Sequence, residues 1–191
     1  MKPFNIKSLS PATWPDFVAL VERHNGVWGG CWCMEFHIDG KERGPHRKER
    51  KACHVKQGTA HAALVYDGVR CVGWCQFGTP EELPRIKHLR AYRKESEAQP
   101  DWRITCLFVD KEYRGKGVSL AAVGGALSEI ARLGGGTVES YPEDVANRKV
   151  SSSFLYNGAL SVFEQHGFKR IRRLGKNHWV VAKVLPGACK A

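Results

Sequence analysis

The chain has 191 residues, 42% of them hydrophobic and 26% charged, which is the composition of an ordinary globular protein large enough to bury one core. No apolar run approaches about 18 residues, and the start of the chain lacks the apolar centre of a signal peptide. We therefore expect a cytoplasmic protein without a membrane span, whose single domain covers residues 1–191. The formal net charge of +11 favours an anionic partner: the phosphates of a cofactor, an acidic acceptor or a nucleic acid.

Seven cysteines are scattered along the chain without paired spacing, at positions 31, 33, 53, 71, 75, 106 and 189. An odd number of this kind indicates reduced thiols and not a disulfide framework. Cys31-x-Cys33 with Cys53-His54 could belong to a zinc site, but the spacing and the lack of a second matched pair argue against it. We predict no metal site.

The first hundred residues contain signals for both strands and helices. Apolar spacing predicts a strand over 4–9 and a helix from Ser10-Pro11 to about 24. A basic helix is expected over 42–57, with Pro45 near its first turn, and a short helix around 85–93. Asp67-Gly68 joins two β-rich runs into a hairpin, and Gly73 in the second run indicates a bulge or a close approach.

The segment over residues 27–37 is unusual because it gathers two Trp, two Cys, a Met and a Phe around Gly29-Gly30. The glycine pair breaks any regular element, which favours an irregular lid or pocket wall. A loop whose aromatic side chains fill the core is an equal alternative. If the segment lines a pocket, four rings could form an aromatic slot for a substrate: Trp28, Trp32, Trp74 and Phe77.

The second half of the chain centres on a strand that leads through a glycine-rich turn into a helix. Residues 104–109 are β-rich, and the apolar stripe from Leu120 to Ala131 has helical spacing. Further elements are expected as a strand over 137–141, a helix over 154–168 closed by Gly167, and two strands over 169–174 and 178–184.

The glycine-rich turn has the properties of an anion-binding site. Free N–H groups at the start of a helix attract a phosphate, Gly115 and Gly117 allow close approach, and Arg114 and Lys116 add positive charge. The spacing fits neither a nucleotide P-loop nor a dinucleotide-binding turn. Arg114-Gly115-Lys116-Gly117-Val118-Ser119 instead resembles motif A of the GNAT superfamily of N-acetyltransferases, with Ser119 in place of the last Gly or Ala.

The resemblance extends to the order of the elements and to a second motif. Ala159, Phe163 and Gly167-Phe168 match the last helix of the family, except that phenylalanine stands where the family often has tyrosine. The implied fold is an α/β (α+β) GNAT fold: a mixed, mostly antiparallel sheet of six or seven strands with helices on both faces, and a central strand followed by the pyrophosphate loop and a helix.

The resemblance also implies acetyl-CoA as the cosubstrate and a primary amine as the acceptor. The residues expected to bind the cofactor are those of the central strand and the turn: Leu107, Phe108, Val109, Arg114, Gly115, Lys116, Gly117, Val118 and Ser119. The acceptor is expected to be a small molecule, and the basic charge favours one that carries a carboxylate or phosphate beside its amine. A homodimer is compatible with this expectation.

The catalytic residues are less well defined by the sequence. An amine with a pKa of about 10.4 must lose a proton, and the candidate bases are carboxylates, with His37 as a further one: Glu35, Glu81, Glu82 and Glu139. With Phe163 at the tyrosine position, Tyr141 and Tyr156 are the alternative donors to the leaving thiolate, although packed aromatics are the commoner role for such side chains.

Two other functions stay open at this stage. Loss of the tyrosine hydroxyl at Phe163 is compatible with a module that binds acyl-CoA as a sensor without turnover. The net charge alone suggests a nucleic-acid-binding protein, but no recognised binding motif supports it.

Overall fold

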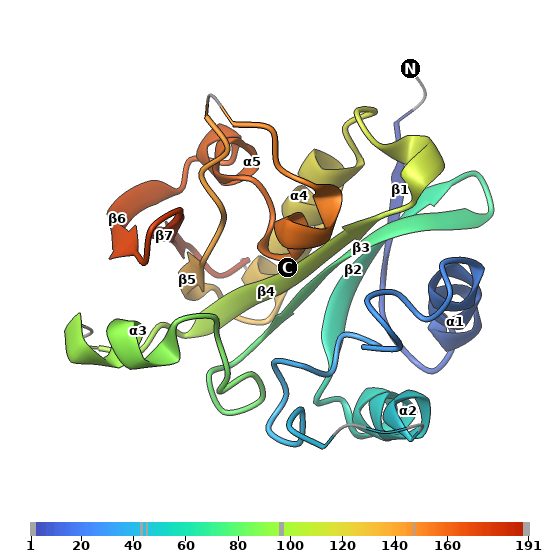
Figure 1. Ribbon diagram of the computed structural model, residues 1–191. Coiled ribbons are helices and arrows are strands. Elements are labelled where there is room, and N and C mark those ends of the chain that lie inside the picture. The colour runs from blue at the N-terminus through green and yellow to red at the C-terminus, as the bar shows by residue number, and fades with distance from the viewer. Residues whose placement is uncertain (1–2, 43, 45, 96–97, 147, 189–191) are drawn as a thin grey trace.

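The strands form one seven-stranded sheet in the order β1-β2-β3-β4-β5-β7-β6 (Figure 1). The computed structural model describes residues 3–42, 44, 46–95, 98–146 and 148–188. The strands are β1 (Asn5–Ser8), β2 (His61–Asp67), β3 (Arg70–Gly78), β4 (Trp102–Val109), β5 (Gly136–Ser140), β6 (Lys169–Leu174) and β7 (His178–Leu185). All neighbours pair antiparallel except β4 and β5, which are parallel. The mixed, mostly antiparallel sheet predicted from the sequence is confirmed.

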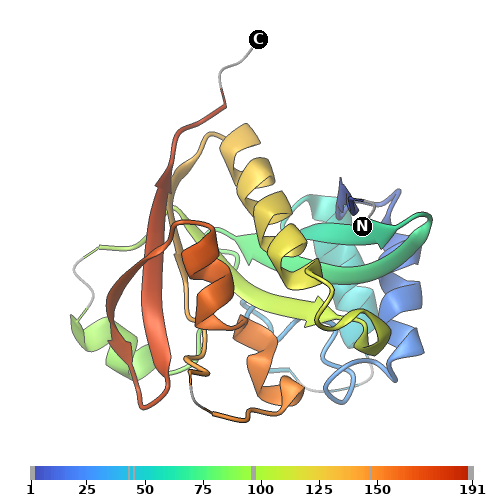
Figure 2. The same ribbon diagram turned by 90° about the horizontal axis from the view of Figure 1, so that it is seen from above.

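Helices cover both faces of this sheet (Figures 1 and 2). The helices are α1 (Trp14–Arg23), α2 (Arg47–Gln57), α3 (Leu89–Glu95), α4 (Val118–Arg132) and α5 (Leu160–Gln165), with 3-10 turns η1 (Lys111–Tyr113) and η2 (Ser152–Asn157). Within the described residues, no helix is both long and apolar enough to cross a lipid bilayer.

Side chains of the central strands alternate between two apolar cores, as the period of a strand requires. On β4, Cys106 and Phe108 belong to the core under α1 and α2, whereas Ile104 and Leu107 belong to the core under α4 and α5. Cys106, Leu107 and Phe108 thus alternate between the two faces, whereas a register shift in the ladder with β3, between Cys106 and Ile104, puts Ile104 in the same core as Leu107. This alternation decides which residue of β4 reaches which side of the functional site.

The hairpin of β2 and β3 forms as predicted, with Gly68 at φ +58° in its turn. Gly73 lies beside a bulge in this ladder, and a Cβ atom there would come within 2.7 Å of Val118 Cγ1 and 2.8 Å of Phe108 O. The close approach expected from the sequence is confirmed, because the start of α4 packs on β3 at this point.

The prediction of one helix over 154–168 is wrong. The segment forms η2 and α5, separated by Gly158 at φ +81° and by Ala159 in an extended conformation. This break allows Glu143 N–H to donate to Gly158 O and Leu160 N–H to donate to Glu143 O. Tyr156 is therefore not on the same helix as Phe163. The basic helix begins at Arg47, and Pro45, expected near its first turn, lies outside the described residues.

Asp110, the residue after β4, connects that strand to its neighbours. Its side chain is 1% exposed and accepts hydrogen bonds from Arg23 at 3.2 Å, Arg70 at 3.0 Å and the backbone N–H of Glu112 at 3.1 Å. Burial acts to raise the pKa of Asp110, but the Glu112 N–H, His24 and Arg70 outweigh it and hold the pKa below its usual value. The carboxylate thus fixes the end of β4 to α1 and β3.

We expect Asp110→Ala to lower the free energy of unfolding by about 2–4 kcal/mol, because it removes a buried carboxylate and leaves its donors without their acceptor. In the unchanged protein this stabilisation is present above the unfolded-state pKa of about 3.9 and is lost as the pH falls through the lower folded-state pKa. Urea denaturation measures the effect. The control is Glu112→Ala, which removes an exposed partner of Arg70 and should cost about 1 kcal/mol or less.

Candidate active site

Two cavities flank the part of β4 that has no partner in β5. The parallel pairing of the two strands covers only Trp102–Ile104 against Val138–Ser140, whereas β4 continues to Val109. The large cavity has a volume of about 820 Å³ and is lined by residues that include Trp28, Cys31, Trp32, Glu35, Phe36, Arg47, Arg85, Lys87, Cys106, Ser153 and Tyr156. The glycine-loop cavity has a volume of about 530 Å³ and is lined by residues of β4, the glycine-rich turn, α4, η2 and α5.

The cavities meet beside β4. Cys106 lines the large cavity and Leu107 lines the glycine-loop cavity, in agreement with the alternation of side chains along the strand. Trp28 and Ser153 line both. The two cavities therefore adjoin beside the unpaired part of β4.

Backbone groups of β4 are directed into this gap. Asp110 N–H donates to Val72 O at 2.8 Å, so Asp110 faces β3. Because residues of an antiparallel strand direct their backbone groups to alternate sides, Val109 and Leu107 present their N–H and C=O groups to the gap. The backbone carbonyl of Thr105 also faces the gap, and it accepts a hydrogen bond from Asn157 Nδ2 at 2.8 Å.

The glycine-loop cavity ends at the N-terminus of α4. Gly115 and Gly117 have φ of +74° and +83°, a conformation that favours glycine. No side chain caps this helix and its first turn contains no acidic residue, so its N–H groups are available to an anion. The residues of the predicted cofactor set that line this cavity are Leu107, Phe108, Val109, Arg114, Gly115, Gly117, Val118 and Ser119. Lys116, the remaining member, instead places its Nζ 4.9 Å from the ring centre of Tyr113.

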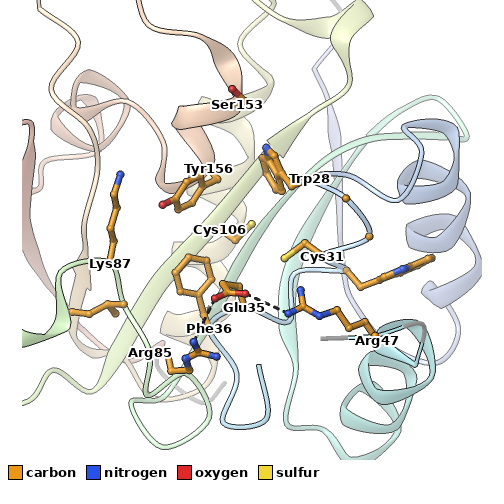
Figure 3. Close-up of a pocket in the computed structure, with 15 residues that line it drawn as sticks. Trp28, Cys31, Glu35, Phe36, Arg47, Arg85, Lys87, Cys106, Ser153 and Tyr156 are labelled. Atoms are coloured by element: carbon orange, nitrogen blue, oxygen red, sulfur yellow. Dashed lines mark hydrogen bonds and ion pairs between the residues drawn. The ribbon is translucent and has the colours of Figure 1, made fainter. Parts of the chain in front are cut away.

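The large cavity contains a carboxylate between two arginines (Figure 3). Glu35 Oε2 lies 3.4 Å from Arg47 Nη2, and Glu35 Oε1 lies 3.4 Å from Arg85 Nη2. The side chain of Glu35 is 41% exposed and remains accessible from the cavity. With Lys87 included, three cations and one carboxylate line this space, which makes it electropositive.

Tyr156 is half-buried on η2, and its ring lies 6.1 Å from the rings of both Trp28 and Phe36 (Figure 3). Burial raises the pKa of Tyr156, and the neighbouring Cys106, Glu143 and Glu35 raise it further. The phenol is therefore neutral at physiological pH and can donate its proton as a hydrogen bond.

Comparison with known proteins assigns the family. The sequence profile of the Acetyltransferase (GNAT) family matches residues 19–150. The chain belongs to this family. It is therefore an acyltransferase enzyme. A comparison with curated protein sequences gives no match.

Solved structures agree with this acetyltransferase in fold. Arylalkylamine N-acetyltransferase like 5b from mosquito has a TM-score of 0.56 at 13% identity, over 96% of this chain and 100% of that one. Phosphinothricin acetyltransferase from Sinorhizobium meliloti in complex with AcCoA has a TM-score of 0.54 at 12% identity, over 98% and 91%. An N-acetyltransferase from Staphylococcus aureus Mu50 has a TM-score of 0.53 at 11% identity, over 98% and 100%. At these identities the likeness concerns the fold alone.

The structure does not bring all predicted site residues of the acetyltransferase together. Glu139 accepts hydrogen bonds from Tyr92 Oη at 2.7 Å and Tyr141 Oη at 3.0 Å, and neither Glu139 nor Tyr141 lines the two cavities. Trp74 and Phe77 are buried in the two opposite cores, so Trp28 and Trp32 alone of the proposed slot reach the large cavity.

Two of the additional candidate bases also have structural partners. Glu82 accepts from Thr79 N–H at 2.9 Å and lies 3.2 Å from His61. His37 is buried against Lys51, and burial and that lysine lower its pKa, so its ring is neutral. Glu35 is thus the candidate base that the cavity contains.

Sequence reasoning missed the arginines that hold Glu35. Arg47 and Arg85 belong to two basic stretches, and there the sequence shows only an excess of positive charge. That excess was the available signal, but nothing in the sequence indicates that the two stretches meet at one carboxylate.

We expect Asn157→Ala to lower the free energy of unfolding by about 1–3 kcal/mol, because the buried carbonyl of Thr105 loses its donor. The same change should loosen η2, which carries Ser153 and Tyr156. Thermal and urea unfolding measure the effect. The control is Asn177→Ala, where the backbone carbonyl that accepts from Asp144 N–H survives the change; equal stability of both variants would contradict the anchoring role.

Proposed function

We propose that this acetyltransferase transfers an acetyl group from acetyl-CoA to the primary amine of a small acceptor that carries an anionic group. The observation that carries the proposal is the pair of cavities that meet at the unpaired end of β4. One has the properties of a polyphosphate site, and the other has a carboxylate in an electropositive, aromatic pocket.

The residues of the glycine-loop cavity fit acetyl-CoA. The uncapped start of α4, Gly115, Gly117 and Arg114 suit the pyrophosphate, and the free backbone groups of Leu107 and Val109 suit the amides of the pantetheine arm. Phe108, Val118 and Ser119 complete the wall, and Lys116 adds charge nearby. Acetyl-CoA supplies an activated thioester, and the AcCoA complex of the Sinorhizobium protein supports this choice.

The large cavity fits an amine acceptor. Glu35 can bind the acceptor's ammonium and take its proton, directly or through a water molecule, which the amine requires because its pKa is about 10.4. Arg47, Arg85 and Lys87 leave an excess of positive charge that attracts a carboxylate or phosphate on the same molecule. Trp28 and Trp32 provide apolar surface for its carbon skeleton.

Two groups assist the remaining steps. A backbone N–H of β4 in the gap can stabilise the oxyanion that forms when the amine attacks the thioester. The neutral hydroxyl of Tyr156 can protonate the departing thiolate, a step that needs little acid because a thiol has a pKa of about 8.5. Tyr156 lines the large cavity and precedes the break at Gly158, so its position does not depend on the helix that carries Phe163.

A sensor that binds acyl-CoA without turnover is the second candidate, favoured by Phe163. Phe163 is fully buried and packs edge-on against Phe168 at 5.3 Å, so it supplies no hydroxyl to the site. Protonation of the leaving thiolate then rests on Tyr156, while Glu35 and the backbone of β4 keep their roles.

We expect acetyl-CoA and CoA to raise the melting temperature, since a ligand at about 100 times its dissociation constant stabilises the folded state by about 2.7 kcal/mol. ATP should have little effect. Arg114→Gln should weaken CoA binding by about ten- to a hundredfold, because one charge-assisted contact is worth about 1.5–3 kcal/mol. The control is Arg132→Gln at the exposed far end of α4. Unchanged CoA affinity in Arg114→Gln would remove the glycine-rich turn from the cofactor site.

We expect acetyl transfer to favour amines that carry a carboxylate or phosphate over the same amines without it. Arg85→Gln should raise KM about tenfold for the anionic amine and little for the neutral one, whereas Arg90→Gln, exposed on α3, should change neither. Steady-state kinetics with paired acceptors measure this. A preference for polycationic amines would contradict the acceptor class, and CoA binding without transfer to any amine would favour the sensor.

A further inference from the structure

The charged side chains that line the large cavity are paired unequally. Glu35 lies 3.4 Å from Arg47 and 3.4 Å from Arg85, so one carboxylate offsets part of the charge of two arginines. Lys87 is the remaining cation in the lining, and no ion pair among the residues that the structure describes includes it. A cation that faces a cavity without a carboxylate of its own can bind the anionic group of a ligand.

Two uncharged rings hold the Lys87 ammonium in place. Its Nζ donates to His178 Nε2 at 3.4 Å, and it lies over the ring of Tyr156, 5.6 Å from the ring centre. A cation at this distance is attracted to the face of an aromatic ring. An ammonium has three donors, and no other acceptor of Lys87 is found in the described part of the chain. Two of its N–H groups therefore remain for a ligand.

The partner of Lys87 is neutral, so the charge of the lysine is not offset. His178 is 4% exposed, and burial, Lys87, His88 and Arg148 lower its pKa to about 4. Glu143, the carboxylate beside His178, lies 3.9 Å from the imidazole Nε2 and only 3.3 Å from Arg148 Nη2. Glu143 thus has a cation of its own, and Lys87 donates to an uncharged ring.

The backbone next to Lys87 is strained. Six non-glycine residues of the described chain have a positive φ; five lie within residues 25–33, a segment that lines the large cavity, and the sixth is His88 at φ +58°. The His88 ring packs 5.6 Å from the ring of His178 and against Gly175, where a Cβ atom would come within 3.1 Å of it. Such conformations persist only where the surroundings enforce them, and they tend to occur at functional sites. Here the strained residue packs outside the cavity, and Lys87 before it lines the cavity.

Lys87 and Glu35 lie on different sides of two aromatic rings (Figure 3). The ring of Phe36 lies beside Glu35, the ring of Tyr156 lies beside Lys87, and the two ring centres are 6.1 Å apart. A ligand that contacts both charged groups must therefore extend along both rings. In an α-amino acid the amine nitrogen is only about 2.5 Å from the carboxyl carbon, which is too short for this span.

We propose that Lys87 binds the anionic group of the acceptor while Glu35 receives its amine, so that the acceptor is an elongated amino acid or amino phosphate with several carbon atoms between its charged ends. The proposal rests on the proposed function, in which Glu35 takes the proton of the amine. The two remaining N–H groups of Lys87 donate to the carboxylate or phosphate, and the rings of Phe36 and Tyr156 pack against the carbon chain. Arg85 holds Glu35 and adds to the positive field of the cavity.

A series of acceptors measures the span between the two charged groups. The enzyme is assayed with acetyl-CoA and glycine, γ-aminobutyrate, ε-aminocaproate or aminopropyl phosphate, each beside the amine of the same length without the anionic group. The long anionic acceptors should exceed both glycine and their uncharged partners at least tenfold in kcat/KM, and the better of carboxylate and phosphate identifies the anion. Glycine that equals the longer amino acids would refute the elongated acceptor.

Removal of one charge tests the role of Lys87. Lys87→Met keeps the length of the side chain and should raise KM for γ-aminobutyrate at least tenfold, because a charge-assisted contact is lost, while kcat and the KM for butylamine stay within about twofold. Lys87→Arg should keep most of the preference. Lys94→Met, exposed on α3, is the matched control and should change neither KM. An unchanged KM for γ-aminobutyrate in Lys87→Met would rule out the contact.

Reversal of the charge gives a sharper test. Lys87→Glu should shift the preference from γ-aminobutyrate to diaminobutane, because a carboxylate at this position attracts a second ammonium and repels a carboxylate. Circular dichroism and the melting-temperature shift with CoA establish that the variant is folded and retains its cofactor site. A folded Lys87→Glu variant that still prefers γ-aminobutyrate would contradict the proposal.

Binding without turnover separates this inference from the proposed function. Calorimetry with γ-aminobutyrate in the presence of CoA measures acceptor binding directly. Binding that depends on Lys87, in a protein that transfers no acetyl group, would support the anion subsite and remove the proposed function. Equal transfer to γ-aminobutyrate and butylamine, unaffected by Lys87→Met, would leave the enzyme and overturn the subsite.

Discussion

The early end of pairing between β4 and β5 is the constraint on which the rest of the site depends. After Ile104 and Ser140 the two parallel strands separate, and β4 continues as a strand bonded on one side only. Unpaired backbone groups inside a protein are costly, so a sheet opens in this way only where other groups satisfy them. Here the side chain of Asn157 meets the first free carbonyl, and the remaining groups face the cavities.

Because side chains of a strand alternate, the unpaired part of β4 contributes to a cavity on each face of the sheet. Cys106 reaches one face of the sheet and lines the large cavity, and Leu107 reaches the other face and lines the glycine-loop cavity, while Trp28 and η2 contribute to both. Asp110 then holds the end of β4 against α1 and β3 through its ion pairs with Arg23 and Arg70. The geometry of the site thus follows from strand periodicity and one buried carboxylate.

Much of this arrangement could be predicted from the sequence because it is encoded locally. The strands and helices follow from local signals: the alternation of apolar residues in the strands, the Asp67-Gly68 turn and the apolar stripe of α4. The glycines after β4 likewise predicted the turn that lines the glycine-loop cavity. The break at Gly158 was missed because apolar spacing continues across it, and only the distant backbone of Glu143 makes the extended conformation favourable.

The large cavity was harder to predict because its contacts are non-local. Glu35 and Arg85 are separated by fifty positions, and Lys51 of α2 reaches Gln76 of β3 only through the packing of α2 on the sheet. Glu139 was a candidate base for the same reason. Its hydrogen bonds to Tyr92 of α3 and to Tyr141 after β5 occupy its carboxylate, and the sequence does not show that these side chains are close.

The two cavities lie on opposite sides of β4, and this arrangement bears on the order in which two reactants could bind. Under the proposed function, acetyl-CoA and the acceptor would occupy different cavities, so the shape of the site alone would impose no order on their binding. Trp28 and Ser153 are the two residues that line both of these cavities, so they lie where the two binding spaces meet.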